Sequence, residues 1–329
     1  MKKEREFAFD IARTIAMIMV IMIHVSNVYS RSFGIIGNKS FIISLIFNTI
    51  CRVSVPIFLM ISGALLLDRK FQLTKYWKRI VKFIILIVVW DSIYLIWEYL
   101  YLGTTYNQLY RLLFEPLRAH LWFLYTILIL YIIQPLLRII MNKSKKSIKI
   151  LLLLVWIFFS TASMLNHTLA EYFTIFSYMG FFIIGKYLYE FAKTKDIKKY
   201  NISLVISMIV LFTISIVLNY QSSHKYNMFY NLYFAYRTPF IMFSSFAFFL
   251  LLVGNYHKAK ENSIIMKCSD LSLGVYLIHG IFLDTTVKTF IYQAISSLLG
   301  IPLFTFIILI ESLIFVSILK KIVIIKELL

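Results

Sequence analysis

Ten long apolar stretches restrict this chain more than any other feature of its sequence. An α-helix needs about 20 apolar residues to cross the hydrocarbon core of a bilayer. The approximate bounds of the stretches are 7–29, 41–67, 80–102, 120–141, 148–166, 173–191, 202–220, 235–254, 271–293 and 302–319. Hydrophobic residues make up 60% of the chain, against about 45–50% in soluble domains. We therefore predict an all-α, polytopic integral membrane protein with about ten transmembrane helices. Residues 1–329 are expected to form a single transmembrane domain with no fused soluble domain.

The basic residues are distributed unevenly along the chain, which carries a formal net charge of +19. If the N-terminus is cytoplasmic, 25 of the 34 Lys and Arg residues fall in cytoplasmic segments or their flanks, and five fall in external segments. Basic residues concentrate on the cytoplasmic side of membrane proteins, so we predict an N-in, C-in orientation. The positive charge then faces anionic membrane lipids rather than nucleic acid, and it would also attract an anionic cytoplasmic substrate.

Several kinds of chemistry lack their usual sequence signature here. The six His residues include no HExxH pattern, and Cys51 and Cys268 form no Cys-rich cluster, so no metal site is predicted. No Walker loop, GxGxxG motif or GxSxG elbow occurs, which argues against nucleotide hydrolysis, dinucleotide redox chemistry and serine hydrolysis. The kind of chemistry that remains is general-base catalysis by a histidine inside a membrane bundle, with arginines nearby.

The first apolar stretch contains three ionisable residues, Asp10, Arg13 and His24. Arg13 and His24 are eleven positions apart, which places them within about 20° of one helix face and about 16 Å apart along the axis. Asp10 lies one turn before Arg13 on the same stripe, where a carboxylate can pair with a guanidinium. Such residues normally face a bundle interior or a watery cavity, so we expect the site here. Alternatively, Asp10 and Arg13 only mark the inner membrane surface and His24 the outer one.

The second stretch places Arg52 close to mid-membrane, with Pro56 four residues later. A proline removes a backbone donor and disturbs the local helix, so we predict a kink at this point. Arg52 would either be neutralised by Asp91 or Glu98 of the third stretch, or line an acyl or phosphate path. The two interpretations are compatible.

The fourth stretch opens with His120, Trp122 and Tyr125. Aromatic residues at the end of a span are commonly part of the interfacial belt, but these three could equally contact a substrate at the external face. The sequence leaves both interpretations open.

The ninth stretch carries Ser272, Tyr276 and His279 at positions i, i+4 and i+7, so they share one helix face. A lone buried His is most often a structural group. Here Tyr276 lies on the same face as His279, and the last stretch can supply Glu311. Together they favour a polar seam between the two helices.

Two other classes of protein compete with an enzyme. A transporter or flippase for a lipid-linked sugar or small solute would use the same polar residues as a permeation path. The chain has only 10 Gly and 5 Pro, which counts mildly against the broken helices of that class. A structural subunit of an envelope assembly would use the ionisable stripe to bind a partner helix.

Four motifs resemble those of membrane-bound acyltransferase family 3. They are Arg13-x10-His24 preceded by Asp10, Arg52-Val-Ser-Val-Pro56-Ile-Phe58 with Ser62-Gly63, His120-Leu-Trp122-Phe-Leu, and Ser272-Leu-Gly-Val-Tyr276-Leu-Ile-His279. With ten spans and this length, the resemblance covers nearly the whole chain. The stand-alone bacterial polysaccharide O-acetyltransferases of the family, such as the enterobacterial common antigen O-acetyltransferase, look most similar.

The resemblance implies transfer of an acyl group from cytoplasmic acyl-CoA to a hydroxyl of an extracytoplasmic or lipid-linked glycan, across the inner membrane of a bacterium. Acetyl-CoA is the expected donor, with succinyl-CoA as an alternative, and a homo-oligomer is not excluded. His24 would act as general base or form an acyl-histidine intermediate, while Asp10 holds Arg13 and Arg13 binds the donor or helps to form the pore mouth. The remaining site residues divide into a set that lines the acyl-CoA site or channel and a set on the acceptor side. The first set is Arg52, Ser62, Tyr276 and His279, and the second is His120, Trp122 and Tyr125.

Overall fold

The computed structural model describes residues 5–68, 70–103, 116–164, 174–289 and 295–322 of the chain. Every regular element within these residues is helical, and none is a strand. The α-helices are α1 (Phe7–Arg31), α2 (Asn38–Cys51), α3 (Ser54–Leu66), α4 (Leu73–Trp97), α5 (Trp122–Lys143), α6 (Lys146–Ala162), α8 (Thr174–Thr194), α9 (Asn201–Tyr226), α10 (Pro239–Tyr256), α11 (Ser263–Thr289) and α12 (Ser297–Leu319). Short helical turns include a π-helix η1 (Glu98–Leu102) and 3-10 turns η3 (Ala119–Leu121), η4 (Ile197–Tyr200) and η5 (Leu232–Phe234).

Eight helical segments among the described residues are long and apolar enough to cross a membrane. They are Phe7–Arg31, Asn38–Leu66, Leu73–Tyr101, Ala119–Lys143, Ile197–Tyr226, Leu232–Tyr256, Ser263–Thr286 and Ser297–Leu319. The prediction of an all-α, polytopic membrane protein is therefore confirmed.

The two predicted spans that are not among these eight correspond to α6 and α8. The first has only 17 residues, and the second carries Lys186, Glu190 and Lys193 in its C-terminal half. The count of ten spans stays a prediction.

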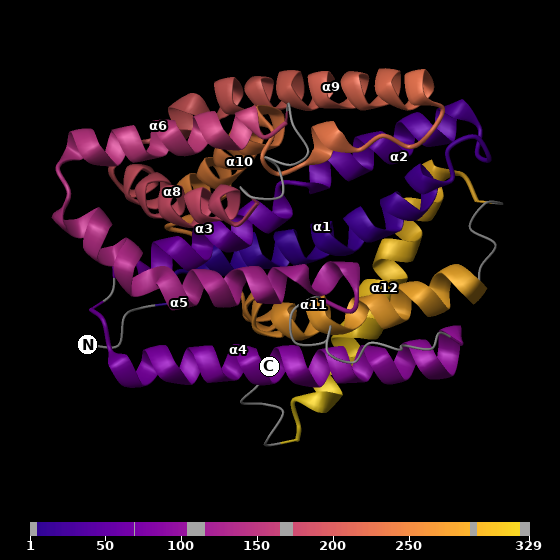
Figure 1. The fold of residues 1–329 in the computed structure, drawn as a ribbon, viewed down its shortest axis with the longest axis horizontal. Helices are drawn as coiled ribbons and strands as arrows, with labels where there is room; N and C mark the ends of the chain where they lie inside the picture. Colours follow the sequence, from indigo (N-terminus) through magenta and orange to yellow (C-terminus); the bar gives the residue numbers. More distant parts are fainter. Residues whose placement is uncertain (1–4, 69, 104–115, 165–173, 290–294, 323–329) are drawn as a thin grey trace.

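The helix α1 occupies the centre of the bundle. It packs against α2, α3, α10, α11 and α12, and more than half of its side chains are buried. Figure 1 shows α1 running through the middle of the molecule, with α9 along one edge and α4 along the opposite edge, while α12 crosses the others steeply. The stripe of ionisable residues predicted on this helix therefore lies inside the protein.

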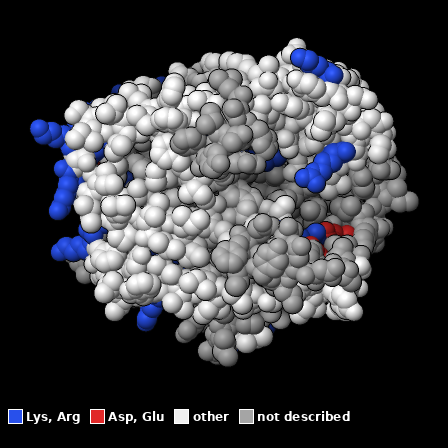
Figure 2. Space-filling model, viewed as in Figure 1, with Lys and Arg blue, Asp and Glu red and all other residues white. Residues whose placement is uncertain are grey.

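The outer helices present apolar side chains outward, as expected where a protein meets lipid instead of water. On α9, for example, Ile202, Ile206 and Ile209 are exposed, whereas few residues of this helix are buried. Lys and Arg side chains project from the end of the molecule at which the N-terminus lies (Figures 1 and 2). This clustering agrees with the predicted orientation, which stays a prediction because no membrane is present.

Two glycines allow α3 and α8 to approach closely. A Cβ added at Gly63 would overlap the backbone carbonyl of Phe182, and one added at Gly185 would overlap the backbone of Met60. Small residues at helix interfaces let two backbones come together where lipid supplies no hydrophobic driving force. This contact anchors the short α3, which follows the interruption in the second span.

The predicted kink in the second span is a two-residue interruption of the helix. The helix α2 ends at Cys51 and α3 begins at Ser54, so Arg52 and Val53 form the joint. Pro56 lies in the first turn of α3, where its missing N–H removes no helical hydrogen bond. The proline thus lies just after the interruption, at the start of the second half of this span.

Candidate functional site

Three histidines from separate elements meet beside the central helix. His24 belongs to α1, His120 to η3 and His279 to α11. The ring centroids are 5.0 Å apart for His24 and His279, 4.9 Å for His120 and His279, and 6.0 Å for His24 and His120. Residues separated by as many as 255 positions are thereby brought into one cluster. The sequence singled out all three, but it assigned them to different parts of the site.

Two of these rings keep an unpaired nitrogen. The Nδ1 of His279 lies 2.6 Å from the carbonyl of Tyr276; because a carbonyl only accepts, this nitrogen carries the proton and Nε2 of a neutral ring is an acceptor. The Nε2 atoms of His120 and His279 are buried and have no hydrogen-bond partner in the described part of the chain. A buried polar atom without a partner is costly, so these two atoms are suited to hold a ligand.

The cluster borders a cavity of about 210 Å³, which we call the histidine cavity. Its defining residues are His24, Asn27, Arg118, His120, His279 and Asp284. Arg118 forms ion pairs with Asp284 and, at 3.4 Å, with Glu98. The positive charge of Arg118 is therefore already balanced by carboxylates.

A glycine and a tyrosine fix the position of His120. A Cβ added at Gly280 would lie 2.7 Å from the His120 ring and from the Tyr94 hydroxyl, so the ring occupies space that any other residue would fill. The hydroxyl of Tyr276 donates a hydrogen bond to the backbone carbonyl of His120. Tyr276 thus contacts the cluster through the backbone, as a support for His120.

No group of His, Cys, Asp or Glu within the described ranges is arranged to hold a metal ion. That the site works without a metal stays a prediction.

At the N-terminal end of α1, Asp10 is the centre of a different cluster. Its carboxylate accepts hydrogen bonds from Arg5 at 2.6 and 2.9 Å and from Ser269 at 2.7 Å, whereas Arg13 is 3.6 Å away. Arg5 also pairs with Asp270 at 2.8 Å. The hydrogen bonds to Asp10, followed by those to Asp270, raise the pKa of Arg5. The predicted pairing of Asp10 with Arg13 is present, but Arg5 is the closer partner.

Arg52 lies at the joint between α2 and α3, and it is not neutralised by Asp91 or Glu98, which was one of the two expectations for it. Asp91 accepts a hydrogen bond from the Tyr125 hydroxyl at 2.6 Å, and Glu98 pairs with Arg118. Neither carboxylate therefore neutralises Arg52. Its Nε donates instead to Oδ1 of Asn48 at 2.9 Å.

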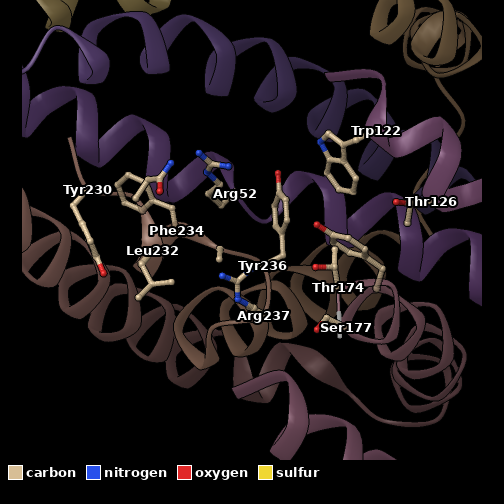
Figure 3. A pocket seen from close by; sticks show the side chains of 13 residues that line it. Arg52, Trp122, Thr126, Thr174, Ser177, Tyr230, Leu232, Phe234, Tyr236 and Arg237 are labelled. Carbon is tan, nitrogen blue, oxygen red and sulfur yellow. The ribbon is translucent and has the colours of Figure 1, made fainter. Parts of the chain in front are cut away.

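The guanidinium of Arg52 lines a second, larger cavity of about 650 Å³, the arginine pocket. We define the pocket by Arg52, Trp122, Tyr178, Phe234, Tyr236 and Arg237. In Figure 3, Tyr236 lies between Arg52 and Trp122, and Arg237 lies below them. Trp122, predicted on the acceptor side, therefore lines this pocket and not the histidine cavity.

The remaining predicted residues lie outside both cavities. Ser62 is on α3 beside Tyr131, and the Ser272 hydroxyl donates to the carbonyl of Ser269, next to Asp10. The buried Oε2 of Glu311 has no partner in the described residues, so the predicted seam with Tyr276 and His279 does not include it.

Sequence reasoning missed Asn27, Asn48, Tyr236 and Arg237. Asn27 could have been found, because it follows His24 by three residues on the same helix and faces the same way. Arg237 directly precedes Thr238 and Pro239, which cap and open α10, and a charge at the start of a span carries no signal of a pocket.

Comparison with known proteins identifies the reaction class. Neither the curated proteins nor the solved structures contain a match to the chain. The model of an acyltransferase domain, that of acyltransferase family 3, matches residues 6–319. This match includes both ends of α1, the three histidines and the last transmembrane helix. The chain therefore belongs to acyltransferase family 3, as a multi-pass membrane protein with a histidine cluster beside its central helix.

Proposed function

We propose that this protein is a transmembrane O-acyltransferase that moves an acetyl group from cytoplasmic acetyl-CoA to a hydroxyl of an extracytoplasmic or lipid-linked glycan, in the inner membrane of a bacterium. The observation that carries the proposal is the histidine cluster, with its two unpaired ring nitrogens in the wall of a cavity. His24 is near the C-terminal end of α1, about 26 Å along the axis from Phe7. With the N-terminus inside, this end faces the acceptor's side of the membrane.

In the proposed reaction, His24 is the general base. Its neutral imidazole takes the proton of the acceptor hydroxyl while the hydroxyl oxygen attacks the carbonyl carbon of the thioester. The carbon–sulfur bond breaks, and the leaving thiolate takes the proton back from His24. The unpaired acceptors of His120 and His279 would hold neighbouring hydroxyls of the acceptor in place. An acyl-His24 intermediate uses the same geometry in two steps.

The donor would enter at the N-terminal end of α1. Arg13 lies there, about 16 Å from His24 along the helix axis, and within the described residues its one ion pair is the 3.6 Å contact to Asp10. The guanidinium of Arg79 lies 5.3 Å from the Tyr131 ring centroid, and Ser62 lies beside the same ring. These groups offer positive charge to the phosphates of CoA. The acyl group, still bound to CoA as the thioester, would then extend along α1 to the histidine cavity.

The test is transfer of label from radioactive acetyl-CoA into cell-envelope glycan, in membranes that carry the wild-type protein or His24→Ala. We expect label only with the wild type. His257→Ala is the matched control, because His257 bonds the carbonyl of Gly254 and lies outside both cavities. Equal label with His24→Ala, at equal expression, would contradict the role of His24.

If the wild type transfers no label from acetyl-CoA, the next donor is succinyl-CoA. Failure of both donors, together with export of a lipid-linked sugar by the wild type, would favour the transporter over the enzyme.

A further inference from the structure

Among the residues that the structure describes, no carboxylate pairs with the two arginines of the arginine pocket, Arg52 and Arg237. The Nε atom of Arg237 is buried and has no hydrogen-bond partner within the same residues. By contrast, Arg118 in the histidine cavity forms ion pairs with two carboxylates. Two arginines that share a cavity without a counter-ion favour an anion.

The aromatic residues of the pocket form a surface for an uncharged part of the same ligand. The rings of Trp122 and Tyr178 are stacked with centroids 4.8 Å apart, and Tyr236 lies 5.9 Å from Trp122 and 6.1 Å from Tyr178. Ring faces pack against C–H groups such as those on one side of a sugar. The volume of about 650 Å³ is within the usual range of small-molecule sites, about 300–1,000 Å³. Arginine and aromatic surfaces together suit a sugar that carries an anionic group.

The segment that supplies Tyr236 and Arg237 is held in place by neighbouring helices. The carbonyl of Tyr233 accepts a hydrogen bond from Ser215 at 2.8 Å, and its N–H donates to Asn219 at 3.2 Å. Thr238 caps the start of α10 by accepting from the N–H of Ile241 at 3.3 Å. The pocket is therefore formed before any ligand arrives, which lowers the entropic cost of binding.

Hydrogen bonds connect the arginine pocket with the histidine cavity. Arg52 donates to Asn48 at 2.9 Å, and Asn48 donates in turn to Asn27 at 2.8 Å. Asn27 lines the histidine cavity, one turn of α1 beyond His24. On the opposite side, His120 and Trp122 are two residues apart and each lines one of the two cavities. A ligand in the arginine pocket would therefore lie next to the reacting groups.

We propose that the arginine pocket binds the phosphate group of the acceptor, so that the acceptor is a phosphate-bearing sugar or polyol and not a neutral glycan. Arg52 and Arg237 form paired hydrogen bonds to the phosphate oxygens, and the sugar packs on Trp122, Tyr178 and Tyr236. This inference rests on the proposed function, because it names the acceptor of that reaction. The phosphate thereby fixes which hydroxyl reaches His24.

The test measures binding without any acyl donor, so that its result is independent of transfer. The full-length protein, in nanodiscs of phosphatidylcholine, is titrated with N-acetylglucosamine 1-phosphate and with neutral N-acetylglucosamine. We expect the phosphorylated sugar to bind at least about tenfold more tightly, since hydrogen bonds between charged groups are the strong ones. Equal affinity for the two sugars overturns the proposal. Tighter binding of glucuronate than of the sugar phosphate would replace the phosphate with a carboxylate and also overturns it.

Variants assign the binding to the pocket. Arg237→Gln should weaken binding of the sugar phosphate about tenfold or more, and Arg237→Lys should restore part of the affinity, because it keeps the charge but not the paired geometry. Lys225→Gln is the matched control, since it removes a positive charge from the exposed end of α9 outside the pocket. An Arg237→Gln protein that binds like the wild type, with an unchanged melting temperature, overturns the assignment.

Two further measurements distinguish this inference from the proposed function and from binding of a lipid headgroup. His24→Ala should bind the sugar phosphate as the wild type does; if it does so but transfers no label, both proposals stand. Normal His24-dependent transfer without selectivity for the phosphate ends only the inference. In nanodiscs that contain phosphatidylglycerol, the affinity for the sugar phosphate should be unchanged. An Arg237-dependent loss of affinity there assigns the pocket to a lipid headgroup and overturns the acceptor role.

Discussion

The two ends of α1 hold their ionisable side chains in different ways. At the N-terminal end, the Asp10 carboxylate accepts hydrogen bonds from Arg5 and from Ser269 of α11, so its charge is paired and its acceptors are used. At the other end, His120 and His279 each keep a buried nitrogen without a partner in the described residues. A saturated cluster fastens helices together, whereas an unsaturated one retains capacity for a ligand. On this basis we call the Asp10 cluster the structural end of α1, and we call the histidine cluster, where we propose that transfer occurs, the chemical end.

The largest expected effect is on transfer at the chemical end. Loss of a general base typically lowers a rate by about 10²–10⁴-fold, so His24→Ala should lower acetyl transfer by that order. Because no fold-defining hydrogen bond depends on His24 in the described contacts, the melting temperature of the purified protein should stay close to that of the wild type. A large loss of thermal stability would make His24 structural and would remove the contrast between the two ends.

The next effect is on stability at the structural end. Asp10→Ala leaves the buried Ser269 hydroxyl without its acceptor and leaves Arg5 with Asp270 as its partner among the described carboxylates, and we expect a loss of about 1–3 kcal/mol of stability. Thermal unfolding in detergent would measure it. Asp10→Asn keeps an acceptor for Ser269 and should lose less. An Asp10→Ala protein that is as stable as the wild type but inactive would place Asp10 in the chemistry.

A pair of glycines on α11 tests whether the exact position of His120 matters. Gly280→Ala forces the His120 ring or the Tyr94 hydroxyl to move, and misplacing a reacting group by about 1 Å can cost about 100-fold in rate. Gly274→Ala is the control, because the atoms nearest to its added Cβ belong to the side chain of Val316 and not to the histidine cluster. We expect transfer to fall about 10- to 100-fold for Gly280→Ala and to change little for Gly274→Ala. Equal rates for both variants would mean that His120 tolerates displacement.

The smallest effect is expected from Tyr276→Phe, which removes the hydrogen bond to the carbonyl of His120. The net value of one such bond is about 1 kcal/mol, so transfer should fall by a factor of about five. The affinity for acyl-CoA should not change, because Tyr276 supports His120 and does not touch the donor. A complete loss of transfer would contradict this supporting role and would indicate that Tyr276 contacts the reacting atoms.

Sequence alone was sufficient for several features that depend on residues close together along the chain. The apolar runs predict the all-α membrane protein, helical periodicity places Asp10, Arg13 and His24 on one inward-facing stripe, and Pro56 predicts the interruption between α2 and α3. The four motifs predict the family that the comparison identifies. These features follow from local geometry, because a helix needs only its own residues to define its length and its faces.

Only the tertiary structure decided which helices lie beside one another, and with them the make-up of the site. His120 and His279 lie beside His24 only because the fold places η3 and α11 next to this part of α1. Asp10 has Arg5 as its closest partner. Asp91 and Glu98 bind other residues and not Arg52. Helical periodicity states which face a side chain is on, but not which helix that face meets. The neighbours are chosen by close packing of whole surfaces, as where Gly63 and Gly185 let α3 and α8 touch. The arginine pocket arises in the same way, from residues of α2, α5, α8 and the segment before α10 that share no local pattern.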